Sequence, residues 1–365
     1  MHKNKNLYFI SVIIPVYNAQ EYLNNCIKCL INQDFKERFE IIIVDDCSSD
    51  LTQKIIKNLN LKNLKNFHFK KNKGQAAARN FGLKKAQGKY VYFMDVDDEI
   101  SINSLKILSE EAKKNNYDYI FSDFKRIEYL KNQRINKYNY YKNKVFSNID
   151  ITSAMIRELH DPSLGHLGLF GCNGRLIRRK ILIDNGIYFD EKLRWLEDKI
   201  FAWDIFSLNI RIKYIRKQLY FYHVHSNVLS TVAASLMNEN PLNYIKIILK
   251  HVEASLKQKI TSTSLVKKFI NQALVFFSIQ ILVSISRSIA LNKLNSKNGK
   301  KLRKKIILKL FSSKNFNKAV KFYSVSKKES PAIPKALRLK KIFFLQKALE
   351  SRAQEIIKLK KSLKI

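Results

Sequence analysis

Cysteine is scarce in this 365-residue sequence, which contains only Cys26, Cys29, Cys47 and Cys172. So few thiols, scattered over so long a chain, exclude a disulfide framework and suit a reducing compartment. Cys26 and Cys29 have the spacing of half a zinc site, but no second cysteine pair or histidine pair completes it. We therefore expect these two thiols to be helix residues packed in the interior and not metal ligands.

Long apolar runs are also missing. The strongest one, Ala273 to Ile285, is shorter than a membrane span and is interrupted by polar side chains, which predicts a buried or interfacial helix. Residues 7–16 are apolar and follow a basic start, but they lack a small-residue cleavage site, so we interpret them as a first strand and not a signal peptide. The sequence therefore favours neither export nor a membrane-embedded processive synthase.

Three common catalytic or phosphate-binding signatures are absent from the sequence. It has no Walker-type loop, no Gly-x-Gly-x-x-Gly opening a helix after the first strand, and no nucleophile elbow. Kinases, dinucleotide-dependent enzymes and serine hydrolases of the usual types each depend on one of these features. The sequence thus disfavours all three classes.

Acidic residues are few, with 30 Asp and Glu against 68 Lys and Arg, and the formal net charge is +38. The excess is concentrated in residues 236–365, which contain 26 Lys and 4 Arg against 5 Glu. A strongly basic surface attracts any polyanion, so nucleic acid and anionic lipid are both candidate partners. The alternative is a helical subdomain whose lysines are simply solvated.

The sequence does contain enough apolar and aromatic residues, 46% and 12%, for a folded protein. Strand-like and helix-like apolar patterns alternate from the N-terminus, which predicts an α/β fold with a mostly parallel sheet flanked by helices. We place a nucleotide-binding and catalytic domain at residues 1–230 and a basic, mainly helical region at residues 231–365. The predicted strands are 8–16, 39–44, 67–69, 89–94, 117–124 and 214–222, the predicted helices are 19–31, 51–59, 75–86 and 101–114, and residues 125–148 are predicted as a loop or irregular hairpin.

Carboxylates directly follow two of the predicted parallel strands, at Asp45 and Asp46 and at Asp95, Asp97 and Asp98. Ligands of such sheets bind beyond the carboxyl ends of the strands. Carboxylates at that edge can hold a divalent cation that bridges two phosphates. An Asp-x-Asp motif alone is weak support, because surface turns often contain one.

Five sequence blocks stand at or near the ends of the predicted elements, and they are SVIIPVYNAQEYL (11–23), EIIIVDDCSSD (40–50), NKGQAAARNFGL (72–83), GKYVYFMDVDD (88–98) and RWLEDKIF (194–201). Together these blocks resemble glycosyltransferase family 2, whose members have a GT-A type nucleotide-binding fold. The resemblance covers roughly residues 8–230, and the blocks follow the order of the family. It implies an inverting, metal-dependent transfer of a sugar from a nucleotide diphosphate donor, with UDP as the expected nucleotide.

The resemblance also implies roles for residues around the donor. Helix capping is the alternative for the Asp45 and Asp46 pair, and a structural salt bridge is the alternative for Arg79. The implied donor-binding residues are Pro15 and Tyr17 in the base pocket, Asp45 and Asp46 at the uracil or ribose, Arg79 beside the diphosphate, and Asp95 at the donor sugar or ribose.

For the metal, the resemblance makes Asp97 the direct ligand of Mn²⁺ or Mg²⁺, with Asp98 as a less certain helper. His225 is a further candidate for a metal or phosphate contact, together with His223, since alternate residues of a strand face the same side. A pair of surface histidines without such a role is the alternative.

The block at 194–201 matches the position of the family's general base. Asp198 is expected to take the proton of the acceptor hydroxyl, and Glu197 is the adjacent alternative, because consecutive helix residues do not face the same way. Trp195 is a candidate for stacking on a sugar or for the core. Arg175 lies near a basic element of the family, but the sequence CNGRLIRR departs from that element and leaves its role open.

These expectations describe a glycosyltransferase that acts on a glycan or glycolipid acceptor in surface polysaccharide or lipooligosaccharide synthesis. We expect it in the cytoplasm, peripherally bound to the anionic inner face of the cell membrane, without a nucleic-acid partner. A nucleic-acid-binding protein and a nucleotidyltransferase are the alternatives. A nucleic-acid-binding function would not account for the sequence blocks that contain the aspartates.

Overall fold

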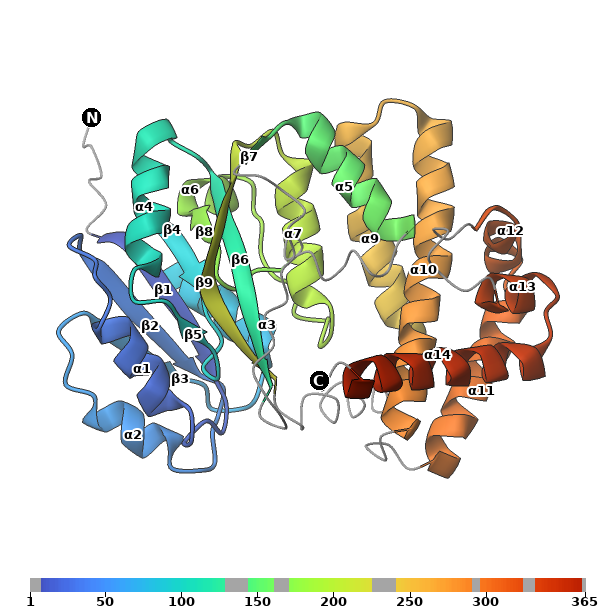
Figure 1. Cartoon of the computed structure of the whole chain (residues 1–365), viewed down its shortest axis with the longest axis horizontal. Helices are drawn as coiled ribbons and strands as arrows, with labels where there is room; N and C mark the ends of the chain where they lie inside the picture. Colours follow the sequence, from blue (N-terminus) through green and yellow to red (C-terminus); the bar gives the residue numbers. More distant parts are fainter. Residues whose placement is uncertain are drawn as a thin grey trace. The chain divides into compact units, whose positions relative to one another are not determined.

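The computed structural model describes residues 8–128, 144–160, 171–224, 241–290, 296–323 and 332–362. These residues form two compact units (Figure 1). The first unit contains the sheet, and the second contains residues 152–160 together with the helices after residue 240. The domain predicted at residues 1–230 placed residues 152–160 together with the sheet. The predicted boundary at residue 230 lies outside the described residues and stays a prediction.

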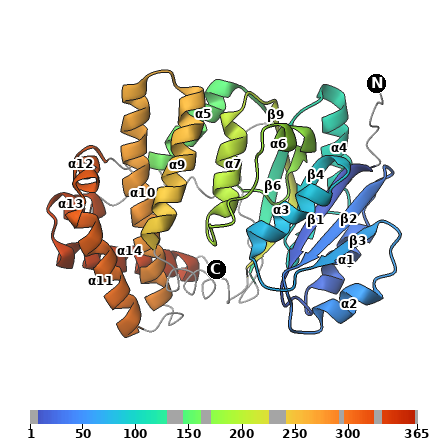
Figure 2. The ribbon, with the colours of Figure 1, turned by 180° about the vertical axis from the view of Figure 1, so that it is seen from behind.

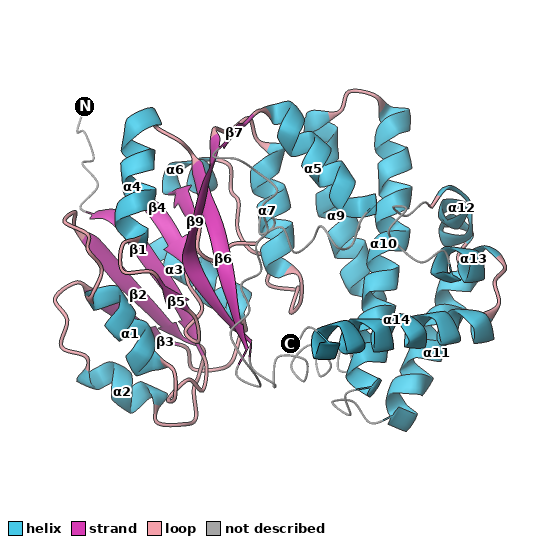
Figure 3. Cartoon of the chain, viewed as in Figure 1, coloured by secondary structure: helices cyan, strands magenta, loops and turns pink. Residues whose placement is uncertain are grey.

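Four parallel strands form one half of the nine-stranded sheet (Figure 3). Their order is β3-β2-β1-β4, so the chain moves outward from β1 in both directions. Because the strands are parallel, their carboxyl ends share one edge, and the loops that follow them meet there. The strands are β1 (Tyr8–Val16), β2 (Phe39–Asp45), β3 (Leu64–His68) and β4 (Gly88–Phe93).

The other half of the sheet is entered through antiparallel pairing of β4 with β8. The order continues β8-β6-β9-β5, and β7 also pairs with β9. The predicted α/β class is confirmed, and the strand predicted at 214–222 is the central part of β9. The strands are β5 (Glu99–Ile100), β6 (Tyr119–Glu128), β7 (Lys144–Phe146), β8 (Leu176–Arg178) and β9 (Ile212–Val224).

Helices cover both faces of the parallel strands, because alternate residues of β1 are buried on opposite sides. Val12 and Ile14 share a buried cluster with residues of α1, α2 and α4. Ile13 points the other way, where a Cβ on Gly82 of α3 would lie 2.4 Å from Ile13 Cγ2. Figure 2 shows α3 crossing that rear face. The helices of this unit are α1 (Leu23–Ile31), α2 (Thr52–Asn58), α3 (Gln75–Lys85), α4 (Ser104–Asn115), α6 (Arg179–Asp184) and α7 (Glu197–Ser207).

The second unit is built around the long helix α10 (Thr263–Ala290), which packs against α9, α11, α12 and α14. By length and composition α10 could cross a membrane, but most of its apolar window is buried in the structure, as in the core helix of a soluble protein. It includes the predicted buried stretch from Ala273 to Ile285. The other helices are α5 (Asn148–His160), which begins in the first unit, α9 (Pro241–Lys259), α11 (Ser296–Ser312), α12 (Lys314–Phe322), α13 (Ala332–Arg338) and α14 (Ile342–Ser362).

A buried carboxylate at the other edge of the parallel strands holds three segments together. Glu40 of β2 is fully buried. It accepts hydrogen bonds from Ser11 Oγ at 2.6 Å and from the Gln87 backbone N–H at 2.7 Å, and Lys65 Nζ lies 2.7 Å away. Since Ser11 is itself fully buried, losing this acceptor leaves a buried hydroxyl donor without an acceptor.

We expect Glu40→Ala to lower the free energy of unfolding by about 2–4 kcal/mol, because it leaves the buried Ser11 hydroxyl without an acceptor and a partly buried lysine without its carboxylate. Chemical denaturation measures the change. The matched control is Glu37→Ala, whose half-exposed carboxylate pairs with Lys113 at the surface and should matter by less than about 1 kcal/mol. Equal effects of the two substitutions would contradict this account.

Candidate functional site

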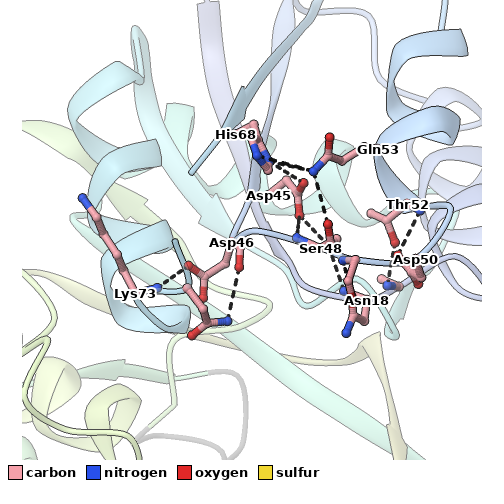
Figure 4. A network of polar contacts seen from close by, with 12 residues as sticks. Asn18, Asp45, Asp46, Ser48, Asp50, Thr52, Gln53, His68 and Lys73 are labelled. Carbon is pink, nitrogen blue, oxygen red and sulfur yellow. Dashed lines mark hydrogen bonds and ion pairs between the residues drawn. The ribbon is translucent and has the colours of Figure 1, made fainter. Parts of the chain in front are cut away.

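The loops after β1, β2 and β3 are joined by a network of polar contacts (Figure 4). Asp45, at the end of β2, accepts hydrogen bonds from the Ser48 backbone N–H at 3.1 Å and from Ser48 Oγ at 2.5 Å. Its other oxygen lies 2.8 Å from His68 Nδ1 at the end of β3. Asn18 N–H in turn donates to Ser48 Oγ at 2.8 Å. Asp45 is therefore buried and organises the loops instead of extending into solvent.

Asp46 fixes the start of α3. Its two oxygens accept hydrogen bonds from the backbone N–H groups of Lys73 at 2.6 Å and Gly74 at 2.7 Å. Gly74 has φ +89°, a conformation that favours glycine, and a Cβ there would lie 1.5 Å from a guanidinium nitrogen of Arg194. Burial raises the pKa of Asp46, and the two backbone hydrogen bonds oppose that shift. Arg194 thus lies over the glycine at the edge of the site.

Pro15 and Tyr17 lie at the end of β1, as the sequence predicts. Pro15 is buried and pairs in register with Val44 of β2, whereas the register with β4 ends earlier, at Ile13. The missing N–H of proline therefore interrupts no ladder on the β4 side. Tyr17 is 52% exposed, so its ring is available to a ligand at this edge.

An acidic cluster follows β4. Oxygen atoms of Asp95, Asp97 and Asp98 lie within 4.8 Å of one another. Burial and the neighbouring charge of Asp95 raise the pKa of Asp97 to about 7. Oxygen ligands at this spacing suit a hard divalent cation such as Mg²⁺ or Mn²⁺.

Asp98 differs from the other two acids because it is buried and holds β9. It accepts hydrogen bonds from Tyr220 Oη at 2.5 Å and from the His223 backbone N–H at 2.8 Å. Burial raises its pKa, and the charges of Asp95 and Asp97 add to the effect. Its buried position indicates that Asp98 supports the structure of the acidic cluster.

Arg79 of α3 joins the acidic cluster to the start of α7. Its guanidinium is 2% exposed and bridges Asp95 Oδ1 at 2.8 Å and Glu197 Oε1 at 3.0 Å. It also lies 5.3 Å from the centroid of the Phe189 ring. The salt bridge that the sequence analysis kept as the alternative for Arg79 is present. The predicted contact with a diphosphate stays a prediction.

Asp95 is held by two further donors that the sequence analysis missed. Gln75 Nε2 donates to Asp95 Oδ1 at 2.8 Å, and Asn173 Nδ2 donates to Asp95 Oδ2 at 2.6 Å. Gln75 stands inside the quoted block at 72–83 and Asn173 inside CNGRLIRR, but nothing in the sequence links them to an aspartate 20 or 78 residues away.

Glu197 and Asp198 occupy the first turn of α7, where a helix N-terminus favours negative charge. Leu196, with φ +66°, makes the turn into this helix, and the preceding Trp195 is partly buried. Burial and the charge of Asp198 raise the pKa of Glu197 to about 7. Burial also raises the pKa of Asp198, whose Oδ1 accepts a hydrogen bond from the Lys199 backbone N–H at 2.7 Å.

Arg175 and the histidines complete the predicted set. Arg175 is 3% exposed and donates to the Asn173 carbonyl at 2.7 Å, so its side chain supports the segment that carries Asn173. His223 is buried at the end of β9, with Nε2 3.7 Å from Glu99 Oε1. His225, the candidate metal contact, lies outside the described residues.

Comparison with known proteins decides the family. Residues 11–186 match the model of "Glycosyl transferase family 2". This region of the chain, residues 11–186, belongs to glycosyltransferase family 2. This match contains the loops after β1, β2 and β4, the whole of α3, and Asn173.

Two curated relatives illustrate the likeness. A poly(ribitol-phosphate) beta-N-acetylglucosaminyltransferase, TarS of Staphylococcus aureus, is 32% identical over 215 residues, which are 58% of this chain and 35% of that protein. A cholesterol galactosyltransferase of Borreliella burgdorferi is 29% identical over 297 residues, 78% of each chain. The matched region thus spans about a third of TarS.

Solved structures show the same fold. Crystal structures of S. aureus TarS 1-349 in complex with UDP and with UDP-GlcNAc match 95% of this chain and 91% of theirs, with TM-scores of 0.62 and 0.63 at 21% and 20% identity. The GT-A type fold implied by the sequence resemblance is therefore confirmed.

We expect Arg79→Met to lower the free energy of unfolding by about 3–5 kcal/mol, because it leaves two partly buried carboxylates without their shared cation. Thermal or chemical denaturation checks this. Arg38→Met, at an exposed position, is the matched control and should change stability by less than about 0.5 kcal/mol. An unfolding midpoint for Arg79→Met equal to that of the control would contradict the bridging role.

Proposed function

We propose that this chain transfers a sugar, with inversion, from a nucleotide diphosphate donor to a glycan or glycolipid acceptor. The observation that carries the proposal is the Arg79 bridge, which ties Asp95 of the acidic cluster to Glu197, the neighbour of Asp198. A one-step displacement on a sugar diphosphate requires carboxylates that can hold a cation and a carboxylate that can act as a base, and this network contains both.

UDP is the proposed nucleotide, and the support comes from a structural relative. TarS 1-349 has been crystallised with UDP and with UDP-GlcNAc. In this chain, the exposed Tyr17 and the loops ordered by Asp45 and Asp46 form the edge where the base and ribose would bind. Since Asp45 and Asp46 already bind loop groups, we propose that they act on the donor mainly by fixing the shape of this edge.

A divalent cation, Mn²⁺ or Mg²⁺, is proposed at Asp97, with Asp95 beside it at the donor sugar or ribose, and the cation would neutralise charge that develops on the leaving diphosphate. The three carboxylates fit such an ion in donor type and spacing. Asp98 would support these residues without binding the cation directly, because both of its oxygens accept hydrogen bonds from β9.

Asp198 is the proposed general base. Glu197 is neutralised by the Arg79 guanidinium, whereas Asp198 forms no ion pair within the described part of the chain. Burial raises the pKa of Asp198, which makes its carboxylate a stronger base towards an acceptor hydroxyl. Glu197 then acts as a positioning residue that anchors the first turn of α7.

The acceptor class is proposed from relatives. A poly(ribitol-phosphate) transferase, a minor teichoic acid biosynthesis protein (GgaA) of Bacillus subtilis and a cholesterol galactosyltransferase are all similar to this chain. These names cover both surface polymers and a lipid. We therefore propose an acceptor used in surface polysaccharide or lipooligosaccharide synthesis, reached from the cytoplasmic face of the membrane, with Trp195 at its sugar.

A donor screen that measures release of nucleoside diphosphate tests the proposed function. Release should occur with one or a few nucleotide sugars, should require Mn²⁺ or Mg²⁺, and should stop in excess EDTA. Release of pyrophosphate instead of nucleoside diphosphate would identify a nucleotidyltransferase and overturn the proposal.

We expect Asp198→Asn to lower the transfer rate by about a hundredfold to ten-thousandfold with donor affinity retained, because the amide keeps the shape but cannot accept a proton. Steady-state kinetics with a donor-binding titration separates the two effects. The matched control is Glu197→Gln. It should lower the free energy of unfolding more than Asp198→Asn does, and its transfer rate should keep more of the wild-type pH dependence. If Glu197→Gln abolishes transfer and Asp198→Asn does not, the base has been assigned to the wrong neighbour.

Metal affinity should depend on pH, because a carboxylate must lose its proton to bind a cation. Burial and Asp95 raise the pKa of Asp97 to about 7, so the proton competes with the metal below that pH. We expect the affinity for Mn²⁺ to rise up to about tenfold per pH unit below pH 7 and then to level off. Calorimetric titration across this range measures it, with Asp97→Ala as the variant that should not bind. A pH-independent affinity would count against Asp97 as the ligand.

A further inference from the structure

In the second unit the chain turns from α13 into α14 (Figure 1). An apolar cluster is exposed at this turn. Leu339 is 56% exposed, Phe343 is 63% exposed and Phe344 is 59% exposed. The two phenylalanine rings are neighbours, with centroids 5.9 Å apart. Large apolar side chains gathered in this way on a surface indicate a binding partner.

The same turn is rich in cations. Lys347 Nζ lies 5.2 Å from the centroid of the Phe343 ring. The sequence contains no acidic residue between positions 332 and 349. The surface therefore combines apolar side chains with uniform positive charge. The exposed cations around Leu339, Phe343 and Phe344 are Lys335, Arg338, Lys340, Lys341 and Lys347.

The turn is firmly held, so the exposure does not result from loose packing. Lys340 adopts φ +51°, and its backbone N–H donates to the Leu337 carbonyl at 3.1 Å. Arg338 donates to the Tyr323 carbonyl at 2.8 Å. Leu337 and Leu345 are buried beneath the turn. The structure thus buries one set of apolar side chains and presents another.

We propose that this corner, defined by residues 335–347, inserts Leu339, Phe343 and Phe344 into the interfacial region of an anionic membrane. Phenylalanine and leucine partition into the boundary between head groups and acyl chains. Lysine and arginine can extend their charged ends to lipid phosphates while their stems lie on apolar surface. An anionic leaflet attracts each nearby cation and so strengthens the binding.

A lipid surface fits the corner better than the other polyanions. Nucleic acid would be bound by the cations alone and would leave three large apolar side chains in water. A protein partner would need acidic and apolar groups in matching positions, whereas a membrane offers both along its whole surface. The inference does not depend on the transfer chemistry, since the corner lies in the second unit and the proposed catalytic residues lie in the first.

Vesicle co-sedimentation of the full chain tests the inference. The wild type should bind vesicles of phosphatidylcholine with phosphatidylglycerol, and should bind phosphatidylcholine alone much more weakly. Phe343→Ser with Phe344→Ser should weaken binding to the anionic vesicles at least about tenfold, because two apolar side chains no longer insert. Its unfolding midpoint should stay near that of the wild type, since both rings are mostly exposed.

Matched controls separate insertion from charge. Ile149→Ser removes an 80% exposed apolar side chain elsewhere and should leave binding unchanged. Lys340→Glu with Lys341→Glu should weaken binding more than Lys300→Glu with Lys301→Glu, which changes the net charge equally at exposed positions of α11. Phe344→Trp should show a blue shift of fluorescence, relative to the wild type, when anionic vesicles are added.

Several results would overturn the inference. Binding by the double serine variant equal to the wild type would show that charge alone holds the protein to lipid. A lipid-free dimer that the same variant converts to a monomer would assign the corner to a second copy of the chain. Nucleoside diphosphate release should be the same in all these variants, so a failure of the proposed transfer reaction is detected separately.

Discussion

A single buried guanidinium determines how the site is assembled. Arg79 has almost no contact with solvent, and its charge is tolerable only because Asp95 and Glu197 reach it from segments 16 and 118 residues away. The end of β4 and the beginning of α7 are therefore placed relative to α3 by one planar group. Because each carboxylate also depends on the cation, the three residues form a unit that is stable only when complete.

Several carboxylates at this edge act on the protein's own backbone. Asp46 holds the N–H groups before α3, Asp45 holds the loop after β2, and Asp98 holds β9. Hydrogen bonds from N–H groups to a charged oxygen are strong, so short loops without regular structure become fixed. A rigid edge of this kind positions a ligand without a large loss of entropy on binding.

The sequence predicted the parts of the fold whose pattern is local. Apolar runs located β1, β2, β4 and β9, and the motif blocks placed Asp45, Asp97 and Asp198 at element ends. It did not predict β5 and β8, because two or three residues carry no readable period. The partners Gln75, Asn173 and Tyr220 were missed for another reason: their contacts join segments that lie 20 or more residues from the acidic cluster, and a single sequence contains no record of such pairs. The predicted roles in binding and catalysis stay predictions.

One of the few acidic residues of the second unit pairs with a buried arginine. Glu350 pairs with Arg303, which is 2% exposed and also donates to Ser286 Oγ at 2.8 Å. Only five glutamates and no aspartate stand among residues 236–365, against thirty lysines and arginines. The folded helices are consequently under mutual repulsion that their own side chains cannot neutralise. The stability of this unit should therefore depend on ionic strength. It should be lower in dilute buffer and higher where many counterions surround the helices.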